Sequence, residues 1–297
     1  MHHTSASYRL FLWFNYGLLT LLALLCLFPL VNILAISFSS SGAVSAGSVT
    51  FWPVDFTLSS YTYMLQNGRF TGSFLVSLTR VVLGVSVNLV LTVLVAYPLS
   101  KEARTFRSRT VYAWIFVFTM LFSGGLIPTY LIVKETGMLD TVWALILPGA
   151  VPIFNVLLML NFFRGLPKEL EEASWIDGAG HLRTLWSVYL PVSLPSIATV
   201  ALFTVVGHWN AWFDGMIYMK NPEHYPLATY LQSMLQQQAA VQTTGSMSLE
   251  EAELLSQVSD RTTQASQIFL SVVPILALYP FLQRYFVQGL VVGSVKG

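Results

Sequence analysis

The sequence contains almost no cysteine and few charges. Its single cysteine, Cys26, lies within an apolar run. One thiol can form neither an intrachain disulfide nor a thiolate cluster, and His208 has no second His or Cys at ligand spacing, so we predict no metal site. Charged residues make up only 10% of the chain, and hydrophobic residues make up 55%. This composition lies far outside the soluble range and predicts a polytopic membrane protein.

Two further absences exclude classes of function. No string of Gly, four residues, Gly-Lys and then Ser or Thr occurs, so the chain lacks the loop that cradles the phosphates of ATP. We therefore predict no catalytic residues and no cofactor bound by this chain. There is also no basic run and no interleaved aromatic patch, which argues against nucleic acid as a partner.

Six stretches contain the roughly 20 apolar residues that a helix needs to cross the hydrocarbon. They predict an all-α, polytopic membrane bundle of six transmembrane helices that forms a single domain over residues 1–297. The polar segments between them are too small for a second domain. The acidic segment 219–263 could face a soluble partner outside or be a solvated connector with one short helix near residues 249–258. The six predicted spans are 11–37, 71–99, 110–133, 141–163, 190–218 and 264–287.

The Lys and Arg residues predict the orientation of these spans. With the N-terminus inside, ten lie on the cytoplasmic side and four outside, with Arg80 left within a span. This bias satisfies the positive-inside rule, and both termini and segment 165–191 are then cytoplasmic. The ten are Arg9, Lys101, Arg104, Arg107, Arg109, Arg164, Lys168, Arg183, Arg284 and Lys296, and the four are Arg69, Lys134, Lys220 and Arg261.

Residues 165–191 form a charged, helix-prone interruption in the apolar second half of the chain, and we call them the signature loop. Pro167 and Gly178 bound a predicted helix from Lys168 to Ile176, and a second short helix is expected before Pro191. Two short amphipathic helices at a membrane surface bury their apolar sides against headgroups or against another protein. Composition does not choose between these.

The spacing within this loop resembles that of the membrane subunits of binding-protein-dependent ABC importers. The family pattern of Glu-Ala-Ala, Gly, Ile and Leu-Pro stands here as Glu172-Ala173-Ser174, Gly178, Val188 and Leu190-Pro191, with Ser174 for Ala and Val188 for Ile. The resemblance implies a type I importer permease fold and a coupling helix that docks on a cytoplasmic ATPase, which binds ATP and Mg²⁺. The expected coupling residues are Glu172, Ala173, Ser174, Asp177, Gly178, Leu190 and Pro191, with Glu172 making the docking contact.

Two other blocks are similar to carbohydrate importers. The tail ending in Val295-Lys296-Gly297 resembles the shorter of the two paired permease types, and residues 122–130 with 140–150 resemble the branch for complex oligo- and polysaccharides. The resemblance covers most of residues 120–297 and is weak over residues 1–70. It implies a bacterial cytoplasmic (inner) membrane protein that works with a second, different permease chain and an extracytoplasmic solute-binding protein. An acidic cargo such as alginate is conceivable.

Arg80 is the most informative residue within a predicted span, because a charge there must face the bundle interior or water. Ser73, Ser77, Gly84 and Asn88 fall on the same helical face. This stripe could line a translocation path, with the guanidinium binding sugar hydroxyls or a uronate. An ion pair with a carboxylate such as Asp214 is an equal alternative.

A second candidate wall of the path lies at the end of the fifth span. We expect Gly207, Asn210 and Asp214 to share a face, with Trp209 and Trp212 offering flat surfaces for sugar rings. An interfacial aromatic belt is the alternative.

Two other classes of function remain open at this point. An ATP-independent sugar carrier would be expected to show internal repeats, and none is convincing. An intramembrane serine protease could use Ser123 and His208, but Leu121 occupies the place of the first Gly in the motif that this class requires.

Overall fold

The computed structural model describes residues 6–66, 68–244 and 261–294. All regular structure in these ranges is helical, which confirms the predicted all-α class. The chain divides into two compact units, residues 1–68 with 234–273 and residues 69–233 with 274–297. The second unit contains every residue predicted to couple to an ATPase or to line a path.

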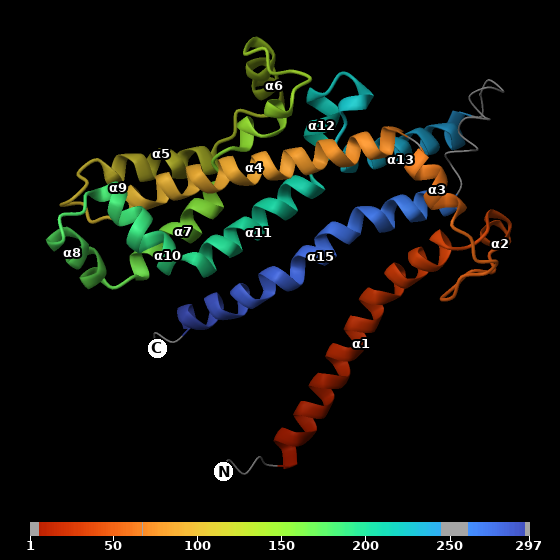
Figure 1. Ribbon diagram of the computed structural model, residues 1–297, viewed down its shortest axis with the longest axis horizontal. Helices are drawn as coiled ribbons and strands as arrows, with labels where there is room; N and C mark the ends of the chain where they lie inside the picture. Colours follow the sequence, from red (N-terminus) through yellow and green to blue (C-terminus); the bar gives the residue numbers. More distant parts are fainter. Residues whose placement is uncertain (1–5, 67, 245–260, 295–297) are drawn as a thin grey trace. The chain divides into compact units, whose positions relative to one another are not determined.

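The first unit begins with the long apolar helix α1 (Figure 1). The segment after α1 folds back on its end, because Ser39 Oγ accepts the Val54 N–H at 3.0 Å and Ser37 bonds to the Tyr61 hydroxyl at 2.7 Å. The Phe38 ring stacks on Tyr61, with ring centroids 4.9 Å apart. The helices of this part are α1 (Ala6–Ser37), α2 (Ser41–Ser45) and α3 (Ser59–Gln66).

The second unit is built around α4, a 33-residue helix. At one end of α4 lie α8 and α9, and α6 and α12 lie beside its other half (Figure 1). The helices from α4 to η4 are α4 (Gly68–Ser100), α5 (Arg109–Leu121), α6 (Leu126–Glu135), η1 (Val142–Leu145), η2 (Leu147–Gly149), α7 (Ile153–Gly165), α8 (Lys168–Ile176), α9 (His181–Thr184), η3 (Leu185–Tyr189), α10 (Leu190–Val192), α11 (Leu194–Asn210), α12 (Phe213–Tyr218) and η4 (Pro222–His224).

Only α1 and α4, among the described helices, are by themselves long and apolar enough to cross a membrane. Two further predicted spans are bent, because α5 and α6 meet at 112° and η1–η2 and α7 at 51°. The end of the signature loop, α9–α10, meets α11 at 83°. By length and composition the described residues therefore offer up to five spans. The six-span count and the single domain stay predictions.

The bends occur where the backbone cannot continue a helix. Gly125 has φ of +87°, a region that residues with a Cβ rarely adopt, and it separates α5 from α6. Pro152 precedes α7, and Pro191 and Pro195 flank the break before α11. Runs that read as single spans are therefore pairs of helices.

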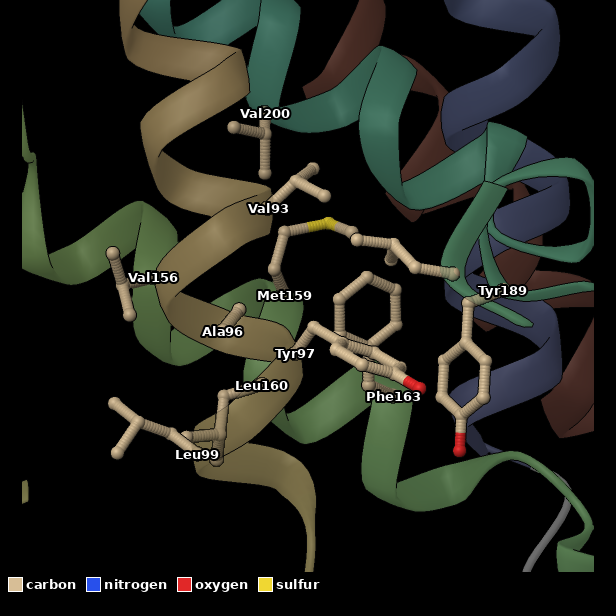
Figure 2. Packing of buried hydrophobic residues seen from close by; sticks show 11 residues of the cluster. Val93, Ala96, Tyr97, Leu99, Val156, Met159, Leu160, Phe163, Tyr189 and Val200 are labelled. Carbon is tan, nitrogen blue, oxygen red and sulfur yellow. The ribbon is translucent and has the colours of Figure 1, made fainter. Parts of the chain in front are cut away.

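The core of the second unit lies between α4, α7, η3 and α11. Tyr97, Phe163 and Tyr189 form its aromatic part, with the Tyr97 and Tyr189 ring centroids 5.0 Å apart and nearly perpendicular (Figure 2). The buried members are Val93, Ala96, Tyr97, Leu99, Val156, Met159, Leu160, Phe163, Leu185, Tyr189 and Val200. This core joins the cytoplasmic end of α4, as oriented by the sequence, to the signature loop.

Two helices complete the described chain. The acidic segment 219–263 contains α13 (Leu227–Thr244), which the polar composition did not predict. The short helix expected near residues 249–258 lies outside the described residues. The last predicted span falls within α15 (Arg261–Ser294), which contains Pro274 and Pro280.

Candidate functional site

The first helix of the signature loop has the predicted bounds, because its ends are set by local chemistry. Pro167 precedes α8, and Glu169 and Glu171 lie in its first turn, where negative charge suits the helix dipole. The helix ends in a turn at Gly178, whose φ of +74° requires a residue without a Cβ. The Ala179 N–H donates to the Ser174 carbonyl at 2.9 Å and closes the turn.

Ser174 holds the two helices of the loop together. It is buried, and its hydroxyl bonds to Thr184 Oγ at 2.9 Å and donates to the Glu171 carbonyl at 2.8 Å. The alanine of the family pattern could form neither bond. Ser174 therefore links α8 to α9 from inside the loop.

The outward side of the loop is acidic and apolar. Glu172, Ala173 and Asp177 are exposed on α8 and its end. Ile176 is 86% exposed, Leu182 68% and Trp186 65%. Leu190 is half-buried and Pro191 is exposed at the start of α10. Large apolar side chains in contact with water mark a surface that another molecule covers.

The inward side of the loop contacts a buried lysine that we did not anticipate. Lys101, which directly follows α4, is 7% exposed. Its ammonium donates to Glu171 Oε1 at 2.6 Å and to the Tyr189 hydroxyl at 2.9 Å, while Tyr189 donates to Glu171 Oε2 at 2.8 Å. The same nitrogen lies 4.0 Å from the centre of the Tyr97 ring. We call Lys101, Glu171 and Tyr189 the lysine cluster.

Burial shifts the pKa values of Lys101 and Tyr189. It lowers the pKa of Lys101, and the hydrogen bond and charge of Glu171 oppose that shift. It also raises the pKa of Tyr189, and there the carboxylate of Glu171 acts in the same direction. The tyrosine is therefore held neutral, as the donor that the geometry requires.

Arg80 forms the ion pair with Asp214 that was one of its two predicted roles. Nη1 donates to Asp214 Oδ1 at 3.1 Å, and Nη2 makes a short contact with Oδ2. Arg80 also donates to the Ala211 carbonyl at 3.1 Å, to the Leu145 carbonyl at 3.4 Å and to His208 Nδ1 at 3.4 Å. Arg80 is 2% exposed. It binds α12 and η1 to α4 and is not a free cation.

A pocket of about 440 Å³ lies beside this ion pair. Asn88 lines it, is 5% exposed, and has no hydrogen-bond partner for Oδ1 within the described chain. His208 Nε2 likewise has none there, and Asn155 donates to Thr204 Oγ at 3.2 Å. Buried acceptors and donors without partners can bind hydroxyl groups. The pocket brings together Arg80, Asn88 and Asp214 of the predicted path residues.

The other predicted path residues lie elsewhere. Ser77 accepts the Leu227 N–H at 2.7 Å, so its hydroxyl holds the start of α13. Trp209 is buried edge-on against Phe74, with ring centroids 5.7 Å apart, and does not offer a free face. Asn210 is exposed at the last position of α11.

The prediction of a shared face for Asn210 and Asp214 was wrong. It assumed a continuous helix, but α11 ends at Asn210 and α12 begins at Phe213. The carbonyls freed by the break are bonded by other elements, Ala211 by Arg80 and Trp212 by the Thr229 hydroxyl at 2.8 Å. Tertiary hydrogen bonds therefore stabilise a break that the apolar pattern does not reveal.

The residues of the enzyme alternative have other partners. The Ser123 hydroxyl accepts the Gly125 N–H at 3.2 Å. His208 accepts from Arg80 through Nδ1, so that nitrogen is not free to act as a base toward Ser123. Nothing in this arrangement favours nucleophilic catalysis.

Comparisons with known proteins agree with the resemblance seen in the loop. The model of the family described as "Binding-protein-dependent transport system inner membrane component" matches residues 65–292. The polygalacturonan/rhamnogalacturonan transport system permease protein YtcP of Bacillus subtilis (strain 168) is 38% identical over 97% of this chain and 99% of its own length. Protein LplC of the same organism is 38% identical over 100% of this chain and 98% of its own.

A solved structure is similar over nearly the whole chain. It is described as a bacterial ABC transporter involved in the import of the acidic polysaccharide alginate. The matched chain is 34% identical, with a TM-score of 0.84 over 96% of this chain and 100% of that one. At this identity and coverage the chain shares the fold of that permease chain.

Proposed function

This chain belongs to the family of binding-protein-dependent transport system inner membrane components, and we propose that it is the permease subunit of an ATP-driven ABC importer of oligo- or polysaccharide. It moves its cargo across the bacterial inner membrane by alternating access, with both termini in the cytoplasm. The chain has no phosphate loop, so the energy reaches it from another subunit.

The outward side of the signature loop carries the coupling part of this proposal. Ile176, Leu182 and Trp186 present a largely exposed apolar surface beside the exposed carboxylates of Glu172 and Asp177. An amphipathic helix pair of this kind fits a groove on a partner protein. The partner is a cytoplasmic ATPase dimer that binds ATP and Mg²⁺.

The loop residues then have separate roles. Glu172 makes the charged docking contact, and Ala173 lets the partner approach α8 closely. Gly178 and Ser174 set the shape of the helix pair, and Leu190 and Pro191 connect it to α11. Displacement of the pair by the ATPase moves the bundle.

Two further partners complete the importer. An extracytoplasmic solute-binding protein delivers the cargo, in keeping with the description of the family. A second permease, a different chain, encloses the path together with this one. The pocket beside Arg80, with Asn88, Asn155 and His208 on its walls, is this chain's contribution to the path.

The cargo is an oligo- or polysaccharide, and an acidic one is the first to test. One relative is named for polygalacturonan and rhamnogalacturonan, and the similar structure for alginate. All three polymers contain uronic acids. Uptake of uronate and neutral oligosaccharides of equal length by the purified complex would identify the class.

The coupling role is tested by reversing the charge of Glu172. Glu172→Lys places a cation where the partner binds an anion, so we expect ATP-dependent uptake to fall by at least about tenfold, because like charges at an interface cost several kcal/mol. The amount of the chain in the membrane should not change, since Glu172 is exposed. The measurement is uptake into proteoliposomes that contain the full complex, with co-purification of the ATPase.

Glu169→Lys is the matched control. It makes the same charge change in the same helix, at another exposed position. We expect it to keep uptake within about twofold, because this charge acts on the stability of the helix N-terminus and takes no part in the proposed docking contact. Undiminished uptake by E172K, or equal loss in both variants, would refute a specific docking contact at Glu172.

A further inference from the structure

The signature loop is joined to α4 through a buried ionic contact. Glu171 belongs to α8, Tyr189 ends η3, and Lys101 follows the last residue of α4. The ammonium of Lys101 therefore bonds to both helical parts of the loop, at 2.6 Å and 2.9 Å. Its third N–H is left to face the Tyr97 ring, 4.0 Å away, which belongs to α4 itself. All three donors of the lysine are used.

Aromatic rings pack beside this contact, which also borders a pocket of about 450 Å³. The Tyr97, Phe163 and Tyr189 rings pack edge to face around the end of α4 (Figure 2), with centroids of Phe163 and Tyr189 5.4 Å apart. Aromatic rings with perpendicular contacts have few alternative positions in a packed core. The ammonium is thus held in one place relative to α4.

The last turn of α4 is also fastened to its neighbours. Arg164, in α7, donates to the Leu99 carbonyl at 3.3 Å, and Arg109, in α5, donates to the Lys101 carbonyl at 3.1 Å. These bonds satisfy carbonyls that a helix end leaves without partners. The end of α4 that contacts the loop is therefore tied to α7 and α5 as well.

The other part of α4 carries the ion pair beside the pocket. Arg80 and Lys101 are separated by about 31 Å along an α-helix at about 1.5 Å per residue. Over this length α4 is one helix, from Gly68 to Ser100, with Pro98 in its last turn. The residues that contact the loop and Arg80 therefore belong to the same helix, so a displacement that shifts α4 as a whole also shifts Arg80.

We propose that Lys101 is the positioning residue that makes α4 move with the signature loop, so that displacement of the loop reaches the pocket beside Arg80. This inference rests on the proposed function and adds the contact through which motion enters the bundle. Glu171 and Tyr189 are its two partners on the loop.

A second pair between the same segments provides a comparison within the chain. Lys168 of α8 pairs with Glu102, the residue after Lys101, but both side chains are more than half exposed. Exposed pairs are screened by water and hold two flexible side chains weakly. We therefore expect the buried pair of Lys101 and Glu171 to transmit a displacement of the loop, and the exposed pair of Lys168 and Glu102 to transmit little of it.

The test removes both charges of the buried pair. Lys101→Met with Glu171→Gln leaves no unpaired buried charge and keeps an acceptor for Tyr189. The complex that co-purifies with the chain is placed in proteoliposomes, and saccharide uptake and ATP hydrolysis are measured together. We expect the saccharide moved per ATP hydrolysed to fall by about tenfold, while the rate of ATP hydrolysis stays within about twofold.

The control is Lys168→Met with Glu102→Gln, which removes the exposed pair. We expect its transport ratio to stay within about twofold of the natural protein. The inference is overturned if K101M/E171Q keeps the natural ratio, or if its uptake and ATP hydrolysis fall together with the ratio unchanged, since that outcome marks a purely structural role. A natural complex that takes up saccharide without ATP overturns the proposed function instead.

Discussion

Gly84 lets the His208 ring lie against α4. A Cβ built on Gly84 would stand 2.5 Å from His208 Nε2 and 2.7 Å from two carbons of the same ring. The ring cannot simply turn away, because its Nδ1 accepts a hydrogen bond from Arg80. A small residue here therefore supports the ion pair four residues earlier.

We predict that Gly84→Ala destabilises the protein by about 1 to 3 kcal/mol, the usual cost of inserting a methyl group into a packed site. Thermal unfolding of the detergent-solubilised chain measures the effect. Gly207→Ala is the control, because Gly207 lies next to His208 in α11 and a Cβ there meets nothing within 4 Å. That variant should gain up to about 1 kcal/mol from helix propensity. Equal stability of the two variants would contradict the close packing.

For a single residue, the sequence predicts the kind of contact it makes better than it predicts which residue it contacts. A charge within a span must be paired or face water, so an ion pair of Arg80 with Asp214 could be anticipated as one of two outcomes. The lysine cluster could not be anticipated from the sequence. Lys101 and Glu171 look like solvated charges beside polar segments, and only the packing of Tyr97 and Tyr189 around them shows that they are buried.

The signature loop is the element whose local structure was predicted best. Proline before α8 and glycine after it act through the backbone alone, so the ends of the helix do not depend on the rest of the fold. The bends within the spans also depend on contacts with other elements. Gly125 interrupts one apolar run, but the break after Asn210 relies on bonds from Arg80 and Thr229 that no local pattern contains.

At the scale of the element, Gly178→Ala should loosen the helix pair. A φ of +74° costs a residue with a Cβ about 1 to 2 kcal/mol, so we expect amide hydrogen exchange in α8 and α9 to speed up by roughly fivefold to thirtyfold if it proceeds by local opening. Exchange measured by mass spectrometry on peptides from residues 165–191 reports it directly.

Gly180→Ala serves as the reference for that experiment. Gly180 has a φ of −79°, and a methyl group added to its Cα would meet no atom within 4 Å, so exchange should be unchanged or slower. Faster exchange in G180A than in G178A would show that the turn does not depend on the left-handed glycine.

For the whole molecule, the orientation in the membrane is the largest prediction still to be tested. It follows from ten Lys and Arg on one side against four on the other. The chain has one cysteine, so Cys26→Ser gives a background without thiols. Single cysteines can then be placed at Trp52 and Ile176, which are 82% and 86% exposed.

We expect a membrane-impermeant maleimide to label W52C in intact spheroplasts, and I176C only in inverted vesicles. The chain is expressed without the ATPase, which would cover Ile176. We expect this labelling pattern because positively charged segments stay on the cytoplasmic side during insertion. Labelling of I176C from outside would invert the topology and remove the signature loop from the reach of any cytoplasmic motor.

The ion pair of Arg80 has a consequence for an acidic cargo. Asp214 cancels the charge of the Arg80 guanidinium, whose carbonyl partners Ala211 and Leu145 are neutral. The side chains that line the pocket therefore carry no excess fixed charge. A uronate chain passing these walls would find hydroxyl and amide groups but no fixed counter-ion. The negative charge of the uronates would have to be neutralised by cations or protons that travel with the chain, or by the facing subunit.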